Sequence, residues 1–280
     1  MTRNIPKEVR DTLRKEVNFG CPIENCGSPY LSYHHFDPPW HIENHHRPEG
    51  MIALCLEHHK QADYGAYTDS QLMELKKNPF LSSSDSVNGQ ISWKRENLVF
   101  LIGGNVFIGA QNIYLNKQEQ LLWLTTDEKD NSLLNLDIKS EKGELIFSMR
   151  ENDWLVMSNF DNIESIPSGK RLSVENKKED LKIDIEFNNY TKEEFQKKYE
   201  KDIPSQWIEL IANKIVGEPI TVCVINGHLT YPFEIKMDSN GTIINGEGSE
   251  ITVMGSLTLK NVKEYKMQRG IVVGSGVLIK

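Results

Sequence analysis

The chain has 280 residues, of which 38% are apolar and 26% are charged, and its formal net charge is −8. The apolar content is sufficient for a packed core and excludes general disorder. The negative balance disfavours a broad phosphate-binding surface, although a small site can use a metal ion as its positive charge.

No targeting or membrane segment is indicated. The stretch from Met1 to Arg14 carries charges throughout, which does not suit a signal peptide, and no apolar run approaches the length of a bilayer crossing. We therefore expect a cytoplasmic protein without membrane contact.

Short elements surround a Cys- and His-rich stretch in residues 1–80. Apolar residues at Val9, Leu13 and Val17 predict a helix, because their four-residue spacing places them on one face. A turn-rich segment, a strand in "YLSYHHF" and a proline-rich loop follow. The run "MIALCLEHHKQAD" predicts a strand that passes into a helix. A capping-box pattern in "TDSQ" predicts another helix from about Asp69 to Lys77.

The composition changes after residues 81–89, "LSSSDSVNG", which we interpret as a linker. From residue 90 to residue 280, short alternating runs punctuated by Gly, Asn, Asp and Ser predict a mostly β domain. One helix interrupts it from about Lys192 to Asn213, and Pro204 should break or kink that helix. The predicted fold class is α+β, with a small module over residues 1–80 followed by a mostly β domain with one helix.

Three of the four cysteines lie near the N-terminus, in a cluster that is more typical of a metal site than of a disulfide framework. Cys21 and Cys26 form a Cys-x₄-Cys pair. Cys55 and His58 are three residues apart, on one face of the predicted helix, so the four side chains could hold a tetrahedral zinc. The alternative is three buried structural cysteines and a surface histidine. Cys223 is expected to be a buried core thiol.

His59 should point about 100° away from His58 around the helix, toward the strand that carries His34 and His35. Successive side chains of a strand point to opposite faces, so a flat strand would present only one of these two histidines to a site. A strand end or a bulge could bring both near it.

The order of these residues resembles the HNH endonucleases over residues 19–77. The shared features are the Cys-x₄-Cys pair, a strand that ends in His34 and His35, a loop with Pro39 and Trp40, and the junction "MIALCLEHH". The resemblance implies a ββα-metal fold, in which two strands and a helix bind one catalytic ion and a structural zinc stabilises the module. It implies that His35 is the general base and that His34 and His59 ligate Mg²⁺ or Mn²⁺. It also implies an endonuclease that hydrolyses phosphodiester bonds of nucleic acid, with DNA as the expected substrate.

One departure from the family concerns its central asparagine, whose place Gly50 occupies. Asn44, His45 or His46 in the preceding loop could substitute for it. Asp63 is interpreted as a residue that caps or orients the helix, or that hydrogen-bonds to a ligand histidine.

Acidic residues outnumber basic ones after Phe80. This disfavours a generic DNA clamp and favours a protein partner or a regulatory ligand for residues 90–280. The architecture is similar to that of bacterial anti-phage defence effectors, whose nuclease stays inactive until a sensor or partner activates it. A restriction-type endonuclease with a DNA-reading β domain and a catalytically inactive zinc-knuckle scaffold are the alternatives. The sequence leaves the choice between DNA and RNA, the sequence specificity and the oligomeric state open.

Overall fold

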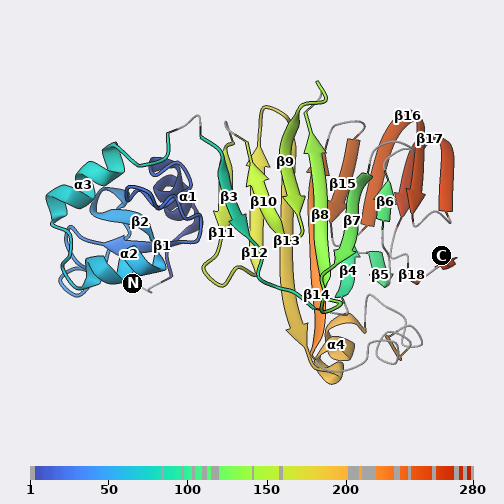
Figure 1. The fold of residues 1–280 in the computed structure, drawn as a ribbon, viewed down its shortest axis with the longest axis horizontal. Coiled ribbons are helices and arrows are strands. Elements are labelled where there is room, and N and C mark those ends of the chain that lie inside the picture. Colours follow the sequence, from blue (N-terminus) through green and yellow to red (C-terminus); the bar gives the residue numbers. More distant parts are fainter. Residues whose placement is uncertain are drawn as a thin grey trace. The chain divides into compact units, whose positions relative to one another are not determined.

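The computed structural model describes residues 4–82, 85–95, 98–102, 105–108, 112–114, 120–140, 142–157, 160–200, 208–209, 219–229, 234–238, 241–253, 257–267, 271–273 and 276–278. It contains both helices and sheets, so the fold class is α+β (Figure 1). Two compact units make up the chain: Met1–Gln90 with Leu155–Asn176, and Ile91–Trp154 with Lys177–Lys280. Within the described ranges, no helix combines the length and apolar character that a bilayer crossing requires.

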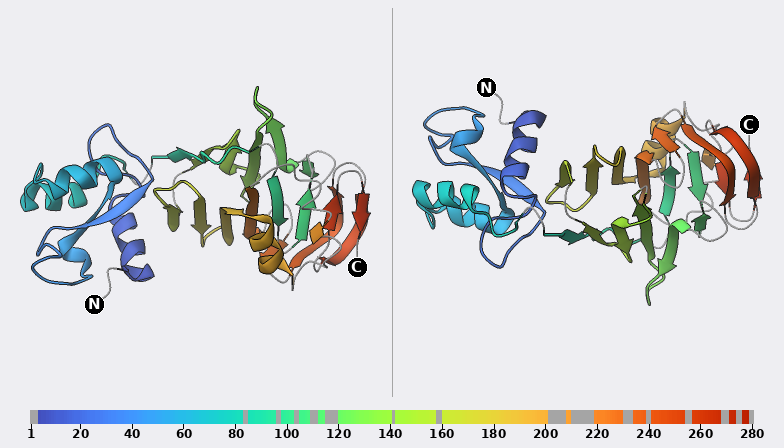
Figure 2. Two further views of the ribbon diagram at one scale, coloured as in Figure 1. Left: turned by 90° about the horizontal axis from the view of Figure 1, so that it is seen from below. Right: turned by 90° about the horizontal axis from the view of Figure 1, so that it is seen from above.

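The first unit is built on a short antiparallel hairpin of β1 (Leu31–His35) and β2 (Met51–Cys55). Helices α1 (Lys7–Glu16) and α2 (Leu56–Asp63) both contact the hairpin. Both views of Figure 2 show α1 and α3 (Asp69–Lys77) on opposite sides of it. The remaining elements are the 3₁₀ helix η1 (Pro48–Gly50) and the strands β3 (Val87–Gln90), β11 (Asn162–Ser165) and β12 (Arg171–Asn176).

Local sequence explains where these elements begin and what they bury. Leu13 and Val17 from the predicted helix face are fully buried in the core of the unit. Helix α3 begins after Thr68, whose hydroxyl accepts from the Gln71 backbone N–H while the Gln71 side chain reaches back, so the predicted capping box is confirmed. Strand β2 is buried at all five positions, and α2 begins directly after it with Cys55 as its N-cap.

Strand β11 belongs to this unit although it lies far along the chain. Arg14 of α1 and Glu164 of β11 are both buried, and the Arg14 Nη1 lies 3.2 Å from the Glu164 Oε1. The same guanidinium donates to the Tyr33 hydroxyl at 2.6 Å and to the Asn162 Oδ1 at 3.3 Å. A parallel bridge pairs Ser165 with residue 30. These contacts hold β11 beside β1.

The second unit is mostly β, and β14 (Ile220–Leu229) pairs with three other strands. It pairs with β13 (Leu181–Tyr190) and β15 (Glu234–Asp238) in antiparallel fashion, and with β4 (Leu98–Ile102) in parallel. The other strands are β5 (Asn105–Ile108), β6 (Asn112–Tyr114), β7 (Gln120–Thr126), β8 (Ser132–Lys139), β9 (Leu145–Arg150), β16 (Gly241–Val253), β17 (Leu257–Met267), β18 (Ile271–Val273) and β19 (Gly276–Leu278). Strand β10 (Asp153–Val156) spans the boundary between the two stretches of chain.

Helix α4 (Lys192–Tyr199) accompanies these strands, and it begins at the predicted residue after an N-cap at Thr191. The predicted break at Pro204 and the predicted end at Asn213 lie outside the described residues. Cys223 of β14 is fully buried, so its prediction as a core thiol is confirmed.

Candidate metal centres and active site

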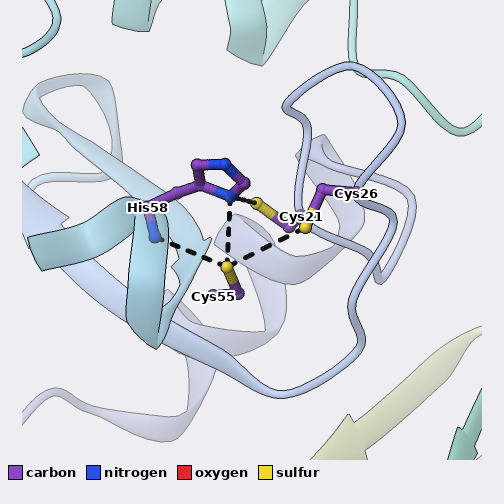
Figure 3. A group of neighbouring side chains, drawn as sticks. All are labelled: Cys21, Cys26, Cys55 and His58. Atoms are coloured by element: carbon purple, nitrogen blue, oxygen red, sulfur yellow. Dashed lines mark hydrogen bonds between the residues drawn. The ribbon is translucent and has the colours of Figure 1, made fainter. Parts of the chain in front are cut away.

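Four of the predicted ligands converge in the first unit: Cys21, Cys26, Cys55 and His58. The His58 Nδ1 lies 3.4 Å from the Cys21 Sγ and 3.2 Å from the Cys55 Sγ. The Cys26 Sγ lies 3.9 Å from the Cys55 Sγ. Figure 3 shows the three sulfur atoms and this ring nitrogen pointing toward a common centre.

Two local structures place these four side chains. Cys21 and Cys26 lie on a tight turn, closed by the Cys21 N–H, which donates to the Ser28 carbonyl at 2.9 Å. Gly27 closes the turn with a φ of +59°, a left-handed conformation that glycine adopts without steric cost. Cys55 is the N-cap of α2, and its sulfur accepts from the His58 N–H. One turn of helix therefore brings Cys55 and His58 together.

The cluster fits a tetrahedral zinc ion. Zinc–sulfur bonds of about 2.3 Å imply sulfur–sulfur edges of about 3.8 Å and sulfur–nitrogen edges slightly shorter. The observed separations of 3.2 to 3.9 Å follow that pattern. Burial raises the pKa values of the Cys21 and Cys26 thiols, so without a cation these thiols stay protonated. A bound dication would reverse that preference, because a coordinating thiol loses its proton.

A second group combines His34, His59 and Asp63. The Asp63 Oδ1 lies 3.2 Å from the His34 Nδ1 and 3.6 Å from the His59 Nε2. The two imidazole rings meet edge to face, with their centroids 5.2 Å apart. Burial lowers the pKa values of both histidines, and Asp63 opposes this shift. Both rings therefore stay neutral near pH 7, as ligation of a metal ion requires.

The donor set fits a divalent cation. Neighbouring ligands of an octahedral ion lie about 3 Å apart when the bonds are about 2.1 Å long. The Asp63 oxygen lies near that distance from the His34 Nδ1, at 3.2 Å, and somewhat farther from the His59 Nε2, at 3.6 Å. Imidazole ligands favour a transition metal such as Mn²⁺, whereas the carboxylate suits Mg²⁺ and Mn²⁺ alike.

His35 is the last residue of β1, and its hydrogen bond identifies the ring nitrogen that carries the proton. Its Nε2 lies 2.9 Å from the backbone carbonyl oxygen of His45. A carbonyl oxygen only accepts, so the Nε2–H of His35 donates and its Nδ1 keeps a lone pair. Burial, opposed by this hydrogen bond and supported by the neighbouring His45 and His46, lowers the pKa of His35 to about 4. The ring is therefore a neutral proton acceptor at pH 7.

The buried side chain of His45 fixes the loop between β1 and β2. Its Nε2–H donates to the Pro38 carbonyl at 2.9 Å, and its Nδ1 accepts from the Arg47 N–H at 3.1 Å. Of the three candidate substitutes for the asparagine, His45 thus both closes the loop and orients His35. Asn44 donates to the Trp40 carbonyl, and His46 stacks on the Trp40 ring.

Gly50 occupies a position that no side chain can share. An added Cβ would lie 1.8 Å from the Asp37 carbonyl oxygen and 3.1 Å from the His45 ring. The Gly50 carbonyl accepts from the Phe36 and Asp37 N–H groups at 2.9 and 3.2 Å. The end of β1 and the start of β2 are therefore joined through direct backbone contact.

A cavity of about 770 Å³ lies beside the second group of residues. His34, His59 and Asp63 line it together with His35, and Glu164 to Pro167 contribute a further part of its wall. Among the described residues of this lining, Arg10 is the one lysine or arginine, whereas Asp63, Asp69 and Glu164 are acidic. A phosphate group would meet little positive charge here unless a cation were bound.

The structure thus brings together every residue predicted for the two sites. Asp63 is the residue of the second group that was not predicted as a possible metal ligand. The sequence indicated a capping or hydrogen-bonding role for it. Its spacing of four residues from His59 on a helix was the signal that could have revealed it, since residues at i and i+4 share a face. No family model, curated protein or solved structure matches this chain.

Proposed function

We propose that this chain is a metal-dependent endonuclease of the HNH type that hydrolyses phosphodiester bonds, with DNA as its main substrate. The observation that carries the proposal is a single cavity lined by a His₂Asp group and by His35, whose Nδ1 is free to accept a proton. The hairpin β1–β2 followed by α2 has the order of elements that the resemblance implies. Cys21, Cys26, Cys55 and His58 would hold a structural zinc.

The residues of the chain would divide the chemistry as follows. His35 Nδ1 would take the proton from the attacking water, while the His45 carbonyl holds the ring in place. His34, His59 and Asp63 would hold a divalent ion, Mg²⁺ or Mn²⁺. When bound, such an ion supplies positive charge that stabilises the negative charge on the phosphate in the transition state. A phosphate group in this acidic cavity would need the positive charge of such an ion.

A catalytically inactive zinc-knuckle scaffold is the second candidate. The observation that favours it is the cavity lining, in which Asp63 and Asp69 are acidic and the third carboxylate, Glu164, is already paired with Arg14. Such a lining repels a nucleic acid whose phosphates are not neutralised. The two candidates differ in whether the chain cleaves nucleic acid.

The test uses the full zinc-loaded chain with duplex DNA, single-stranded DNA and RNA, each with Mn²⁺ or Mg²⁺. We expect cleavage that a chelator of Mn²⁺ and Mg²⁺ abolishes. The His35→Ala variant should lose about 10²- to 10⁴-fold in rate, the range typical of a general base, and should still bind Mn²⁺. A matched control is His228→Ala, because His228 lies on β14 of the other unit and pairs with Asp180.

Two results would contradict the enzyme proposal. The first is a wild-type chain that binds Mn²⁺ and cleaves none of the three substrates, which would favour the scaffold. The second is a His35→Ala chain that cleaves at the wild-type rate, which would remove His35 as the base.

Residues 90–280 are proposed to bind a protein partner or a regulatory ligand, as in a defence effector whose nuclease is gated. The support is the acidic balance of this part of the chain, which does not suit a DNA-reading surface. DNA binding by a full chain whose cavity is inactivated through His35→Ala would favour the restriction-type alternative, if that binding persisted without divalent ions.

A further inference from the structure

Ser32 lies on β1 two residues before His34, so both side chains point to the same face of the strand. Its Oγ lies 2.7 Å from the His59 Nδ1 and 3.1 Å from the Leu54 carbonyl oxygen. The register of the hairpin places Ser32 directly opposite Leu54, which keeps the second contact in place. The hydroxyl therefore joins the strand pair to the ring of a proposed metal ligand.

The hydrogen bonds of Ser32 determine which ring nitrogen of His59 carries the hydrogen. The Ser32 hydroxyl has one hydrogen, and the Leu54 carbonyl oxygen can only accept. If Ser32 donates to Leu54, the hydrogen between Ser32 and His59 must belong to the His59 Nδ1. The His59 Nε2, which faces Asp63 at 3.6 Å, then carries a lone pair. If Ser32 donated to the His59 Nδ1 instead, the hydrogen would be on Nε2, and that nitrogen could not ligate an ion.

The first arrangement satisfies more groups. In it the Ser32 hydroxyl donates to the Leu54 carbonyl oxygen at 3.1 Å, whereas in the second arrangement these two oxygen atoms would face each other with no hydrogen between them. The Ser32 oxygen keeps lone pairs that can accept the Nδ1–H of His59. Both contacts are then made at once, with the serine as donor to one group and acceptor from the other.

We infer that Ser32 is a positioning residue that holds His59 in the Nδ1–H tautomer and so directs its Nε2 lone pair toward the ion shared with His34 and Asp63. This inference rests on the proposed function, because it assumes a divalent ion at that group. Ligand histidines generally depend on such a partner for their second nitrogen, and loss of the partner weakens metal affinity by about 10- to 100-fold. Ser32 would act on the ion through the His59 ring and would not itself ligate the ion.

The test measures Mn²⁺ affinity of the full, zinc-loaded chain by calorimetric titration, without nucleic acid. Ser32→Ala is expected to weaken Mn²⁺ binding by about 10-fold or more, while the zinc content and the urea midpoint of unfolding stay unchanged. Ser32→Thr keeps a hydroxyl and suits a strand, so it should restore most of the affinity. Ser70→Ala is the matched control, since Ser70 is exposed on α3 and its Oγ contacts Thr68.

Equal Mn²⁺ affinity of the Ser32→Ala and wild-type chains would overturn the inference. A loss of affinity that comes with lost zinc or a lowered urea midpoint, and that Ser32→Thr does not restore, would also overturn it, because Ser32 would then be merely structural. A wild-type chain that binds no Mn²⁺ would overturn both the ion site and this inference. A wild-type chain that binds Mn²⁺ but cleaves nothing would refute the proposed nuclease and leave the Ser32 result valid.

Discussion

Replacing Gly50 with asparagine would restore the residue that the resembling family has at this position, yet we expect the change to damage the first unit. An added Cβ would lie 1.8 Å from the Asp37 carbonyl oxygen, and this oxygen belongs to the backbone, so the loop itself would have to move. Such a movement would also separate the Gly50 carbonyl from the Phe36 and Asp37 N–H groups.

The magnitude follows from these contacts. Two lost backbone hydrogen bonds cost about 1 kcal/mol each, and forcing extra atoms into a packed site typically costs about 1–3 kcal/mol. The Gly50→Asn variant should therefore lose about 3–5 kcal/mol of unfolding free energy in the first unit. The proposed nuclease activity should fall as well, because the loop orients His35 through the His45 carbonyl.

Urea denaturation followed by fluorescence would measure this loss. The matched control is Gly65→Asn, because a Cβ at Gly65 meets no atom within 4 Å and the φ of +77° is one that asparagine tolerates better than most residues. We expect the control to lose about 1 kcal/mol at most. If the Gly50→Asn chain were as stable as the Gly65→Asn chain, and cleaved DNA faster than wild type, our account of the loop would be refuted.

Two further changes test the packing of the first unit. Cys21→Ser should remove the bound zinc and destabilise the unit, because a structural zinc contributes directly to folding free energy; Cys223→Ala, which changes a buried thiol in the other unit, should keep one zinc per chain by atomic absorption. Arg14→Met should lower the unfolding free energy by at most about 3–5 kcal/mol, because the buried Glu164 carboxylate loses its nearest cation and keeps Arg10 and Arg171 at 4.0 Å. Adding Glu164→Gln to that variant should recover part of the loss in urea denaturation, and a double variant no more stable than Arg14→Met would contradict the importance of the pair.

Much of the secondary structure of the first 80 residues could be predicted from local sequence patterns. The capping box at Thr68 and the helix that follows it appear at the expected residues, because both depend on a few neighbouring positions. The separation of His58 from His59 also follows from helix geometry alone, and the structure places one in the thiol cluster and the other beside His34. Such features require no knowledge of the rest of the chain.

Other features depend on contacts that the sequence does not display. The choice of His45 over Asn44 and His46 follows from which loop residue is buried and which carbonyl faces His35. The contribution of Glu164 to the cavity wall depends on a partner, Arg14, that lies 150 positions away. No periodicity or spacing in the sequence links residues so distant.

The discontinuity of the first unit limits how this chain can be divided or recombined. The chain passes between the two units three times, after Gln90, Trp154 and Asn176. A fragment that stops at Gln90 would contain both groups of candidate metal ligands, yet it would leave Arg14 without Glu164 and the cavity without part of its wall. Because the first unit is built from two separate stretches of the chain, recombination at a single point in the gene could not transfer the complete unit. The nuclease-like part and the β-rich part should therefore be inherited together.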